Sequence, residues 1–190
     1  MRIISGSARG RKLAEFTGSG IRPTPDRVRE ALFSMLTSRL GSLQGLKVLE
    51  LCAGSGAMSL EALSRGAAFA CLVDSSRQAA QLIKENLTRC RMQQQARLIQ
   101  GPVEKVLGGS QINGSFDLIF MDPPYNQGLV PVFLQQIDSL NLLAQNGIIS
   151  AETEAKEQFE LPDAFALLES RRYGSSAVHF IVHQNSQGLE

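Results

Sequence analysis

The chain has 190 residues, of which 43% are hydrophobic and 19% charged, a composition typical of a soluble globular protein with one well-formed core. The net charge of +1 excludes recognition of nucleic acid through overall charge, and no apolar run reaches the roughly 18–20 residues that cross a bilayer. The basic residues between Arg2 and Lys12 interrupt any apolar signal region, so we expect a cytoplasmic protein.

Positive charge is concentrated in the first 29 residues, where seven basic residues against two acidic ones give +5 and leave −4 for the remainder. Residues 1–23 predict a small basic N-terminal extension, either a short β element with a turn at 7–13 or an arm that orders on its partner. A solvated surface is the alternative to an anionic partner. The candidate contacts to such a partner are Arg2, Arg9, Arg11, Lys12, Arg22 and Arg27.

A helix is predicted to open at Thr24, which can cap it, with Pro25 in its first turn, and to end at Gly41. Its apolar stripe is predicted at Val28, Ala31, Leu32, Met35, Leu36 and Leu40. Further helices are predicted at 57–65, 77–90 with Ser76 as the cap, 103–107 and 129–144.

Strands are predicted between these helices, at 46–51, 69–74, 96–100, 116–121 and 147–151. A closing β pair is predicted at 167–170 and 177–182 around a turn at 171–176, and 185–190 is predicted as a frayed tail. Alternation of strands and helices predicts an α/β fold, a doubly wound and mostly parallel seven-stranded sheet with an antiparallel edge. Its domain is predicted to span residues 24–184.

A glycine turn at residues 52–56 follows the first strand and precedes a helix. Its glycines let the backbone approach a ligand closely, and the helix start offers free N–H groups. The turn is not the dinucleotide fingerprint, because Ser59 stands where the third glycine is needed, and it lacks the Gly-Lys-Ser/Thr of a P-loop. Glu50 beside it would repel a diphosphate but suits a ligand with an ammonium group.

Two later strand ends complete a predicted nucleoside site. Asp74 can accept hydrogen bonds from both ribose hydroxyls, and residues 101–103 can line an adenine. A nucleoside with an amino-acid tail and no phosphate describes S-adenosylmethionine, the predicted cofactor. The alternative is a scaffold whose carboxylates only cap helices. The predicted cofactor contacts are Thr24, Glu50, Cys52, Ala53, Gly54, Ser55, Gly56, Asp74, Ser75, Gly101, Pro102 and Val103.

The fourth strand ends in Asp122-Pro123-Pro124-Tyr125. The two prolines remove consecutive N–H donors and stiffen a corner at the carboxyl edge of the sheet. Asp122 and the Pro123 carbonyl can accept the two hydrogens of an exocyclic amine, and Tyr125 can stack on a base. These four residues are the predicted catalytic set for methyl transfer to an exocyclic amine, a step governed by positioning. A purely structural turn is the alternative.

No metal site is predicted. The three cysteines, Cys52, Cys71 and Cys90, are widely spaced and form no CxxC pair. His179 and His183 lie at an even spacing in the last predicted strand, which indicates edge or surface residues and not ligands.

Several segments together resemble the bacterial small-subunit (16S) ribosomal RNA guanine-N2 methyltransferase family, within the Rossmann-like S-adenosylmethionine-dependent methyltransferases that carry a DPPY motif. Beyond the glycine turn and the corner, the segments that carry this resemblance are 2–6, 8–13, 22–33 and 60–67. It implies methyl transfer to the N2 amine of a guanine in 16S ribosomal RNA, with that RNA or the assembling small subunit as partner. It also implies that Thr24-Pro25 holds the methionine carboxylate.

The chain departs from the pattern expected of that family at three places. Glu50 and Cys52 stand where Asp and Phe are expected, and Gly101-Pro102 replaces a polar or acidic residue. We expect a monomer. Two other functions stay open: an N6-adenine DNA methyltransferase, which normally needs a separate region to read sequence, and a non-catalytic RNA-binding protein, against which the intact corner argues.

Overall fold

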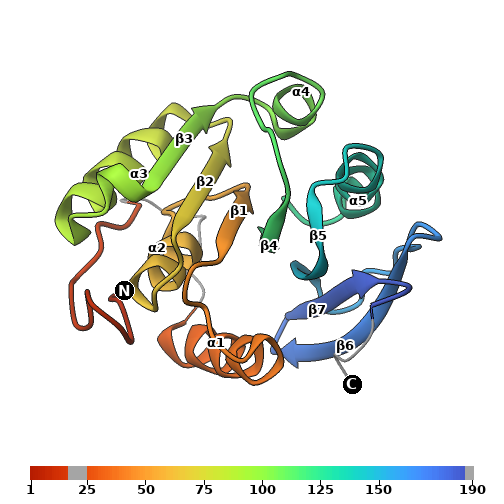
Figure 1. Ribbon diagram of the computed structural model, residues 1–190, viewed down its shortest axis with the longest axis horizontal. Coiled ribbons are helices and arrows are strands. Elements are labelled where there is room, and N and C mark those ends of the chain that lie inside the picture. Colours follow the sequence, from red (N-terminus) through yellow and green to blue (C-terminus); the bar gives the residue numbers. More distant parts are fainter. Residues whose placement is uncertain (17–24, 187–190) are drawn as a thin grey trace.

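The computed structural model describes residues 1–16 and 25–186. In this part of the chain seven strands form one sheet in the order β3-β2-β1-β4-β5-β7-β6 (Figure 1). The strands are β1 Lys47–Leu51, β2 Phe69–Asp74, β3 Ala96–Gln100, β4 Phe116–Met121, β5 Leu143–Glu154, β6 Phe165–Tyr173 and β7 Ser176–His183. The helices are α1 Asp26–Leu40, α2 Ala57–Ser64, α3 Arg77–Cys90, α4 Val103–Leu107 and α5 Leu129–Ser139, with a 3₁₀ turn η1 at Gln93–Gln95.

The first five strands are parallel, and β7 and β6 add an antiparallel edge beyond β5. This confirms the predicted fold class. The chain winds outward from β1 to β3, then crosses to the other side of β1 to form β4. The carboxyl ends of β1 and β4 therefore lie at the point where the winding reverses, which is where open α/β sheets bind ligands.

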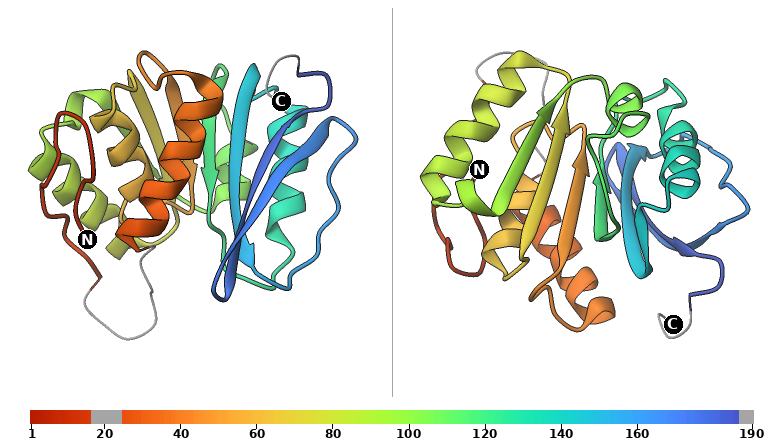
Figure 2. Two further views of the ribbon diagram at one scale, coloured as in Figure 1. Left: turned by 90° about the horizontal axis from the view of Figure 1, so that it is seen from below. Right: turned by 45° about the horizontal axis from the view of Figure 1, so that its top comes forward.

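Helices cover both faces of the sheet, with α1 on one side and α4 and α5 on the other (Figures 1 and 2). The first face packs Leu32, Phe33 and Leu60 into one core. The second packs Phe133 and Ile137 into another, which reaches the opposite sides of the same central strands. Because both faces are covered, the central strands read as continuous apolar runs.

Helix α1 differs from the sequence prediction in its buried face. The buried residues are Arg29, Leu32, Phe33 and Leu36, so the stripe is rotated from the one expected and contains a charged residue. Pro25 occupies the N-cap position instead of the first helical turn, and Gly41 follows the last residue with φ +72°. Thr24 lies outside the described residues.

The sequence prediction was also wrong about the boundaries of the last strands. Strand β5 begins at Leu143, which had been assigned to the preceding helix, and runs to Glu154. Its pairing with β4 contains an irregularity, since Phe116 pairs with Leu143 but Leu118 pairs with Ile148. The polar residues of this bulge interrupt the apolar pattern and hide the strand start. The β6–β7 turn is likewise tighter than predicted, because both strands continue to Tyr173 and Ser176.

The first 14 residues form a small hairpin, with an isolated β-bridge between Arg2 and Lys12, docked on α2 and α3. Buried Glu61 of α2 accepts hydrogen bonds from the amides of Ile4 at 2.8 Å and Ser5 at 3.0 Å. Gly6, at φ +83°, passes so close to the α2 backbone that a β-carbon would lie 1.7 Å from the Ser64 carbonyl oxygen. Residues 17–23 of the predicted basic extension lie outside the described residues, and its part in binding a partner stays a prediction.

No helix in the described ranges combines the length and apolarity needed to cross a bilayer.

Candidate active site

Strands β1 and β4 place the two predicted halves of the site next to each other. Leu51 pairs with Met121, and the Asp122 amide donates to the Leu51 carbonyl at 3.4 Å. The residues that follow, Cys52 and Asp122, therefore leave the sheet side by side. The glycine turn and the Asp-Pro-Pro-Tyr corner are two walls of one site.

The glycine turn depends on backbone conformations that few side chains tolerate. Gly56, at φ +74°, caps α2, and a β-carbon there would lie 2.9 Å from Leu72 Cδ2. Gly54 has φ +55°, and its amide donates to Asp74 Oδ2 at 2.8 Å. Cys52 has φ +58°, an unusual value for a residue with a side chain and one that is enriched at functional sites.

Glu50 lies beneath this turn and is 5% exposed. Its Oε2 accepts the amide hydrogen of Ser59 in the first turn of α2, at 2.8 Å. Burial raises the pKa of Glu50 to about 7, against the opposing effect of the hydrogen bonds from Ser59 and Met58. A carboxyl group with a pKa near neutrality can ionise when a cationic ligand arrives.

Asp122 directly follows β4, lines the same cavity and is exposed to solvent. Loss of hydration of the carboxyl group against the surrounding protein raises the pKa of Asp122, and the negative charges of Glu152 and Glu50 raise it further, to about 8. The negative charges of these two neighbours therefore disfavour ionisation of Asp122.

The Pro-Pro-Tyr corner is held by the end of β5. The Tyr125 hydroxyl donates to Glu152 Oε1 at 2.9 Å, and Asn126 Nδ2 donates to Glu154 Oε2 at 2.6 Å. Tyr125 is 40% exposed. Burial and the adjacent Glu152 raise the pKa of Tyr125, so its hydroxyl remains a donor. An exposed ring fixed in this way is available for stacking.

One cavity brings together six of the predicted site residues: Glu50, Cys52, Ala53, Gly54, Ser55 and Asp122. The other predicted cofactor and catalytic residues that the structure describes do not line it: Gly56, Asp74, Ser75, Gly101, Pro102, Val103, Pro123, Pro124 and Tyr125. Asp74 uses both carboxylate oxygens on backbone amides, those of Gly54 and Ser76, each at 2.8 Å. The Gly101 amide is also engaged, with the Asp74 carbonyl at 2.9 Å.

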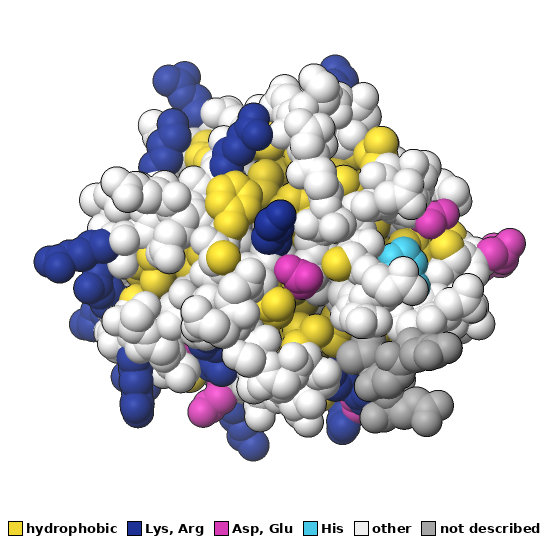
Figure 3. Space-filling view, viewed as in Figure 1, with side chains coloured by type: hydrophobic (Ala, Val, Ile, Leu, Met, Phe, Trp, Pro, Cys, Tyr) yellow, Lys and Arg dark blue, Asp and Glu magenta, His cyan; other side chains and the backbone are white. Residues whose placement is uncertain are grey.

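The predicted contacts to an anionic partner are distributed along the hairpin and α1. Lys and Arg side chains gather at the left of Figure 3, where Figure 1 shows α3 and the N-terminal segment. Arg11 Nη1 donates to the Arg89 carbonyl at 2.6 Å, so the hairpin adjoins the end of α3. Arg2 is 70% exposed and lies 3.5 Å from Asp26. Arg22 lies outside the described residues.

Among the described residues no cluster of three or more histidine, cysteine, aspartate or glutamate side chains could hold a metal ion. The two histidines have other partners. His179 contacts the hydroxyls of Thr153 and Ser170 at 3.0 and 2.7 Å, and His183 stacks on Phe165.

Comparison with known proteins decides the family. The model of the family described as "Conserved hypothetical protein 95" matches residues 1–182. Ribosomal RNA small subunit methyltransferase D of Haemophilus influenzae is 33% identical over 186 residues, which cover 97% of this chain and 94% of the relative. The protein of the same name from Escherichia coli is 32% identical, over 99% of this chain and 92% of the relative. The chain belongs to the ribosomal RNA small subunit methyltransferase D family.

A solved structure is similar to this chain over nearly its whole length. A hypothetical protein of Thermus thermophilus superposes with a TM-score of 0.79 at 33% identity, over 96% of this chain and 99% of the other. The family match begins at residue 1 and includes the docked hairpin.

Sequence reasoning missed several residues that line the cavity of this family member. Three of them have charged side chains: Glu15, Arg29 of α1 and Glu152 of β5. Phe16 also lines the cavity. The helical periodicity of the sequence contains a signal for Arg29. Arg29 precedes Leu32 by three residues and Phe33 by four, which places all three on one face of α1. Glu152 lies near the end of a parallel strand next to β4, much as Asp122 follows the end of β4.

The raised pKa of Glu50 predicts a stability that depends on pH. The unfolded chain releases this proton near pH 4.5, whereas the folded protein holds it to about pH 7, so the wild type should lose stability relative to Glu50→Gln as pH rises through that interval. The difference is on the order of 3 kcal/mol. Urea unfolding of both proteins between pH 4.5 and pH 8 measures it. Stability curves that stay parallel across this range would contradict the assignment.

Proposed function

We propose that this protein transfers a methyl group from S-adenosylmethionine to the exocyclic N2 amine of a guanine in small-subunit ribosomal RNA. The observation that carries the proposal is the single cavity that joins Glu50 and the glycine turn to Asp122. Relatives named ribosomal RNA small subunit methyltransferase D support the substrate.

The residues of the cavity fit S-adenosylmethionine. Gly54 lines the cavity, and among the described residues a β-carbon there would have only Phe16 Cε2 nearby, at 3.9 Å, so the turn leaves room for a ligand on this side. Glu50 offers a carboxylate to an ammonium group. The glycine turn carries no lysine for a phosphate, in agreement with a nucleoside that has none. Bound here, S-adenosylmethionine supplies a methyl group on a positively charged sulfur, which needs no further activation.

The acceptor side of the site is formed by the corner. Asp122 and the Pro123 carbonyl accept the two hydrogens of the amine and thereby orient its lone pair toward the methyl group. Tyr125 stacks on the base, and Glu152 holds its hydroxyl. The amine loses one proton after it gains the methyl carbon, and the ionised form of Asp122 accepts it; the raised pKa of Asp122 makes this carboxylate a stronger base than an ordinary aspartate.

Transfer of tritium from labelled S-adenosylmethionine tests this function. Unmodified small ribosomal subunits, naked ribosomal RNA and duplex DNA are compared, and the labelled product is digested to nucleosides. N2-methylguanosine from ribosomal RNA in either form is the expected product. N6-methyladenine from DNA would replace the proposal with the DNA enzyme, and RNA binding without transfer to any substrate would indicate a non-catalytic protein.

Neutralising the hairpin should weaken RNA binding. With Arg9, Arg11 and Lys12 replaced by Gln, the slope of log K against log salt concentration should become shallower by about 2 to 3, because each phosphate contact contributes about 0.7 to 0.9. Cofactor affinity should not change. Filter binding over a series of salt concentrations measures the slope.

A control removes the same charge elsewhere, with Lys105, Lys156 and Arg172 replaced by Gln. These three are exposed and lie on α4, after β5 and on β6. Their loss should leave the slope within error of the wild type. If both triple variants shift the slope equally, the hairpin has no special part in binding RNA.

A further inference from the structure

Arg29 carries two hydrogen-bonding nitrogens that the protein does not use. The side chain is 0% exposed and is one of the residues that line the cavity. Within the described residues, neither Nε nor Nη1 has a hydrogen-bond partner. Burying a guanidinium whose N–H groups lack hydrogen-bond acceptors costs folding free energy. A ligand that accepts hydrogen bonds from these N–H groups would offset this cost.

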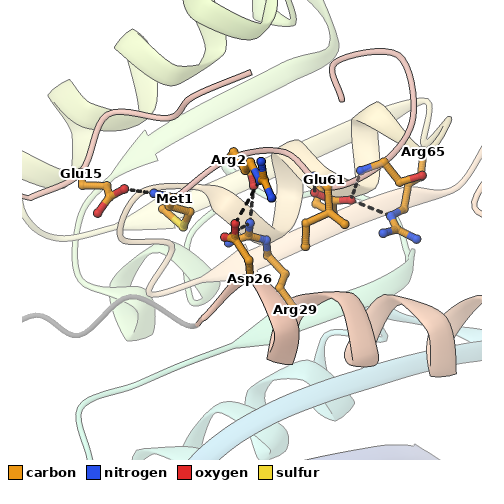
Figure 4. Close-up of polar contacts among 9 residues, drawn as sticks. Met1, Arg2, Glu15, Asp26, Arg29, Glu61 and Arg65 are labelled. Atoms are coloured by element: carbon orange, nitrogen blue, oxygen red, sulfur yellow. Dashed lines mark hydrogen bonds and ion pairs between the residues drawn. The ribbon is translucent and has the colours of Figure 1, made fainter. Parts of the chain in front are cut away.

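The third nitrogen fixes where the guanidinium lies. Nη2 donates to the Arg2 carbonyl and to Asp26 Oδ1, the latter at 3.0 Å, so the hairpin and the start of α1 both hold it (Figure 4). Leu32 and Phe33, one turn further along the helix, continue the buried stripe to which Arg29 belongs. The head group is therefore placed by the fold before any ligand binds.

The charges around the cavity are of two kinds. Four acidic residues line it, Glu15, Glu50, Asp122 and Glu152, and Arg29 is the one arginine or lysine among the described lining residues. Glu15 is paired with the terminal ammonium of Met1. The remaining carboxyl groups suit the positive parts of a ligand, and Arg29 suits a negative part.

We propose that Arg29 binds the α-carboxylate of S-adenosylmethionine through the N–H groups that the protein leaves unpaired. This rests on the proposed function. The amino-acid end of that molecule carries an ammonium and a carboxylate on one carbon, and Glu50 and Arg29 offer the two opposite charges within one cavity. A guanidinium forms strong, directional hydrogen bonds to a carboxylate, particularly where water is excluded.

The ligand itself provides the first test, on the unchanged protein. Calorimetry compares S-adenosylmethionine with decarboxylated S-adenosylmethionine, which lacks only the carboxylate. The wild type should bind the decarboxylated ligand about a hundredfold more weakly. If it binds neither ligand, both the proposed function and the proposed role of Arg29 are contradicted. If it binds both equally, only the role of Arg29 is overturned.

The second test locates the effect. Arg29→Met should weaken binding of S-adenosylmethionine about a hundredfold and leave the affinity for the decarboxylated ligand within a few-fold. Arg29→Lys, which keeps the charge, should recover part of the loss. Arg39→Gln is the matched control, since Arg39 lies on the same helix, pairs with Glu169 at 3.1 Å and does not line the cavity. Equal losses for both ligands in Arg29→Met, without recovery by lysine, would show a structural role instead.

Discussion

Replacing Asp122 by alanine should lower the rate of methyl transfer by about a thousandfold, the loss expected when one preorganised hydrogen-bonding group is removed from a transition state. Cofactor affinity should change by no more than a few-fold. The reason is that Asp122 follows the end of β4, whereas the residues proposed to hold the cofactor lie in the glycine turn after β1, so Asp122 is expected to contact the acceptor amine. Single-turnover transfer to ribosomal RNA and calorimetry with S-adenosylhomocysteine measure the two quantities.

Two further variants serve as comparisons for Asp122→Ala. Asp122→Asn keeps one carbonyl oxygen to accept a hydrogen and should retain more activity than alanine does. Asp163→Asn removes the charge of an exposed aspartate between β5 and β6 and should be indistinguishable from the wild type. Loss of cofactor binding together with activity in Asp122→Ala would contradict an acceptor-side role.

The parallel half of the fold could be predicted from the sequence because its signals are local. Strand β2 at Phe69–Asp74 and strand β4 at Phe116–Met121 are short apolar runs between turn residues, and their predicted bounds are those observed. Ser76 caps α3 by accepting the Ala79 amide at 3.3 Å, as its position before the helix predicts. Such runs can be recognised from the local sequence, without information about the strands that pair with them.

The antiparallel half could not be predicted as well, because its strands depend on pairing. Strand β6 is mostly exposed or half-buried, with no regular alternation, and it extends to Tyr173 because β7 pairs with it. The bulge between Leu143 and Ile148 is defined by pairing with β4, since Phe116 pairs with Leu143 before the bulge and Leu118 pairs with Ile148 after it. Neither feature has a local signal in the chain.

The site shows the same division. Glu50 and Asp122 could be found because each follows from its place at a strand end. The helical spacing before Leu32 and Phe33 could have placed Arg29 on the buried face of α1, but not its hydrogen bond to the carbonyl of Arg2, which comes from another part of the chain. The predicted ribose role of Asp74 stays a prediction, and the structure adds that both its oxygens already hold backbone amides.

Replacing Glu50 by glutamine should weaken cofactor binding about a hundredfold at neutral to slightly alkaline pH, because the variant keeps the hydrogen bond to the Ser59 amide but cannot supply a charge to the ammonium group. In the wild type the pKa of about 7 means that Glu50 must ionise for the ammonium to bind. Its affinity for S-adenosylhomocysteine should therefore fall by roughly one to two orders of magnitude from about pH 7.5 to about pH 5, as the ionised fraction falls.

The proton that Glu50 releases separates this cause from a general loss of stability at low pH. At about pH 6, calorimetry in buffers of different ionisation enthalpy should report release of close to one proton on binding to the wild type, and close to none for Glu50→Gln. Asp122→Asn is the control, because it removes the other carboxyl group with a raised pKa, and it should keep the proton release. If the release disappears in Asp122→Asn and persists in Glu50→Gln, the ammonium group is held from the β4 side of the cavity, and Glu50 serves only to begin α2.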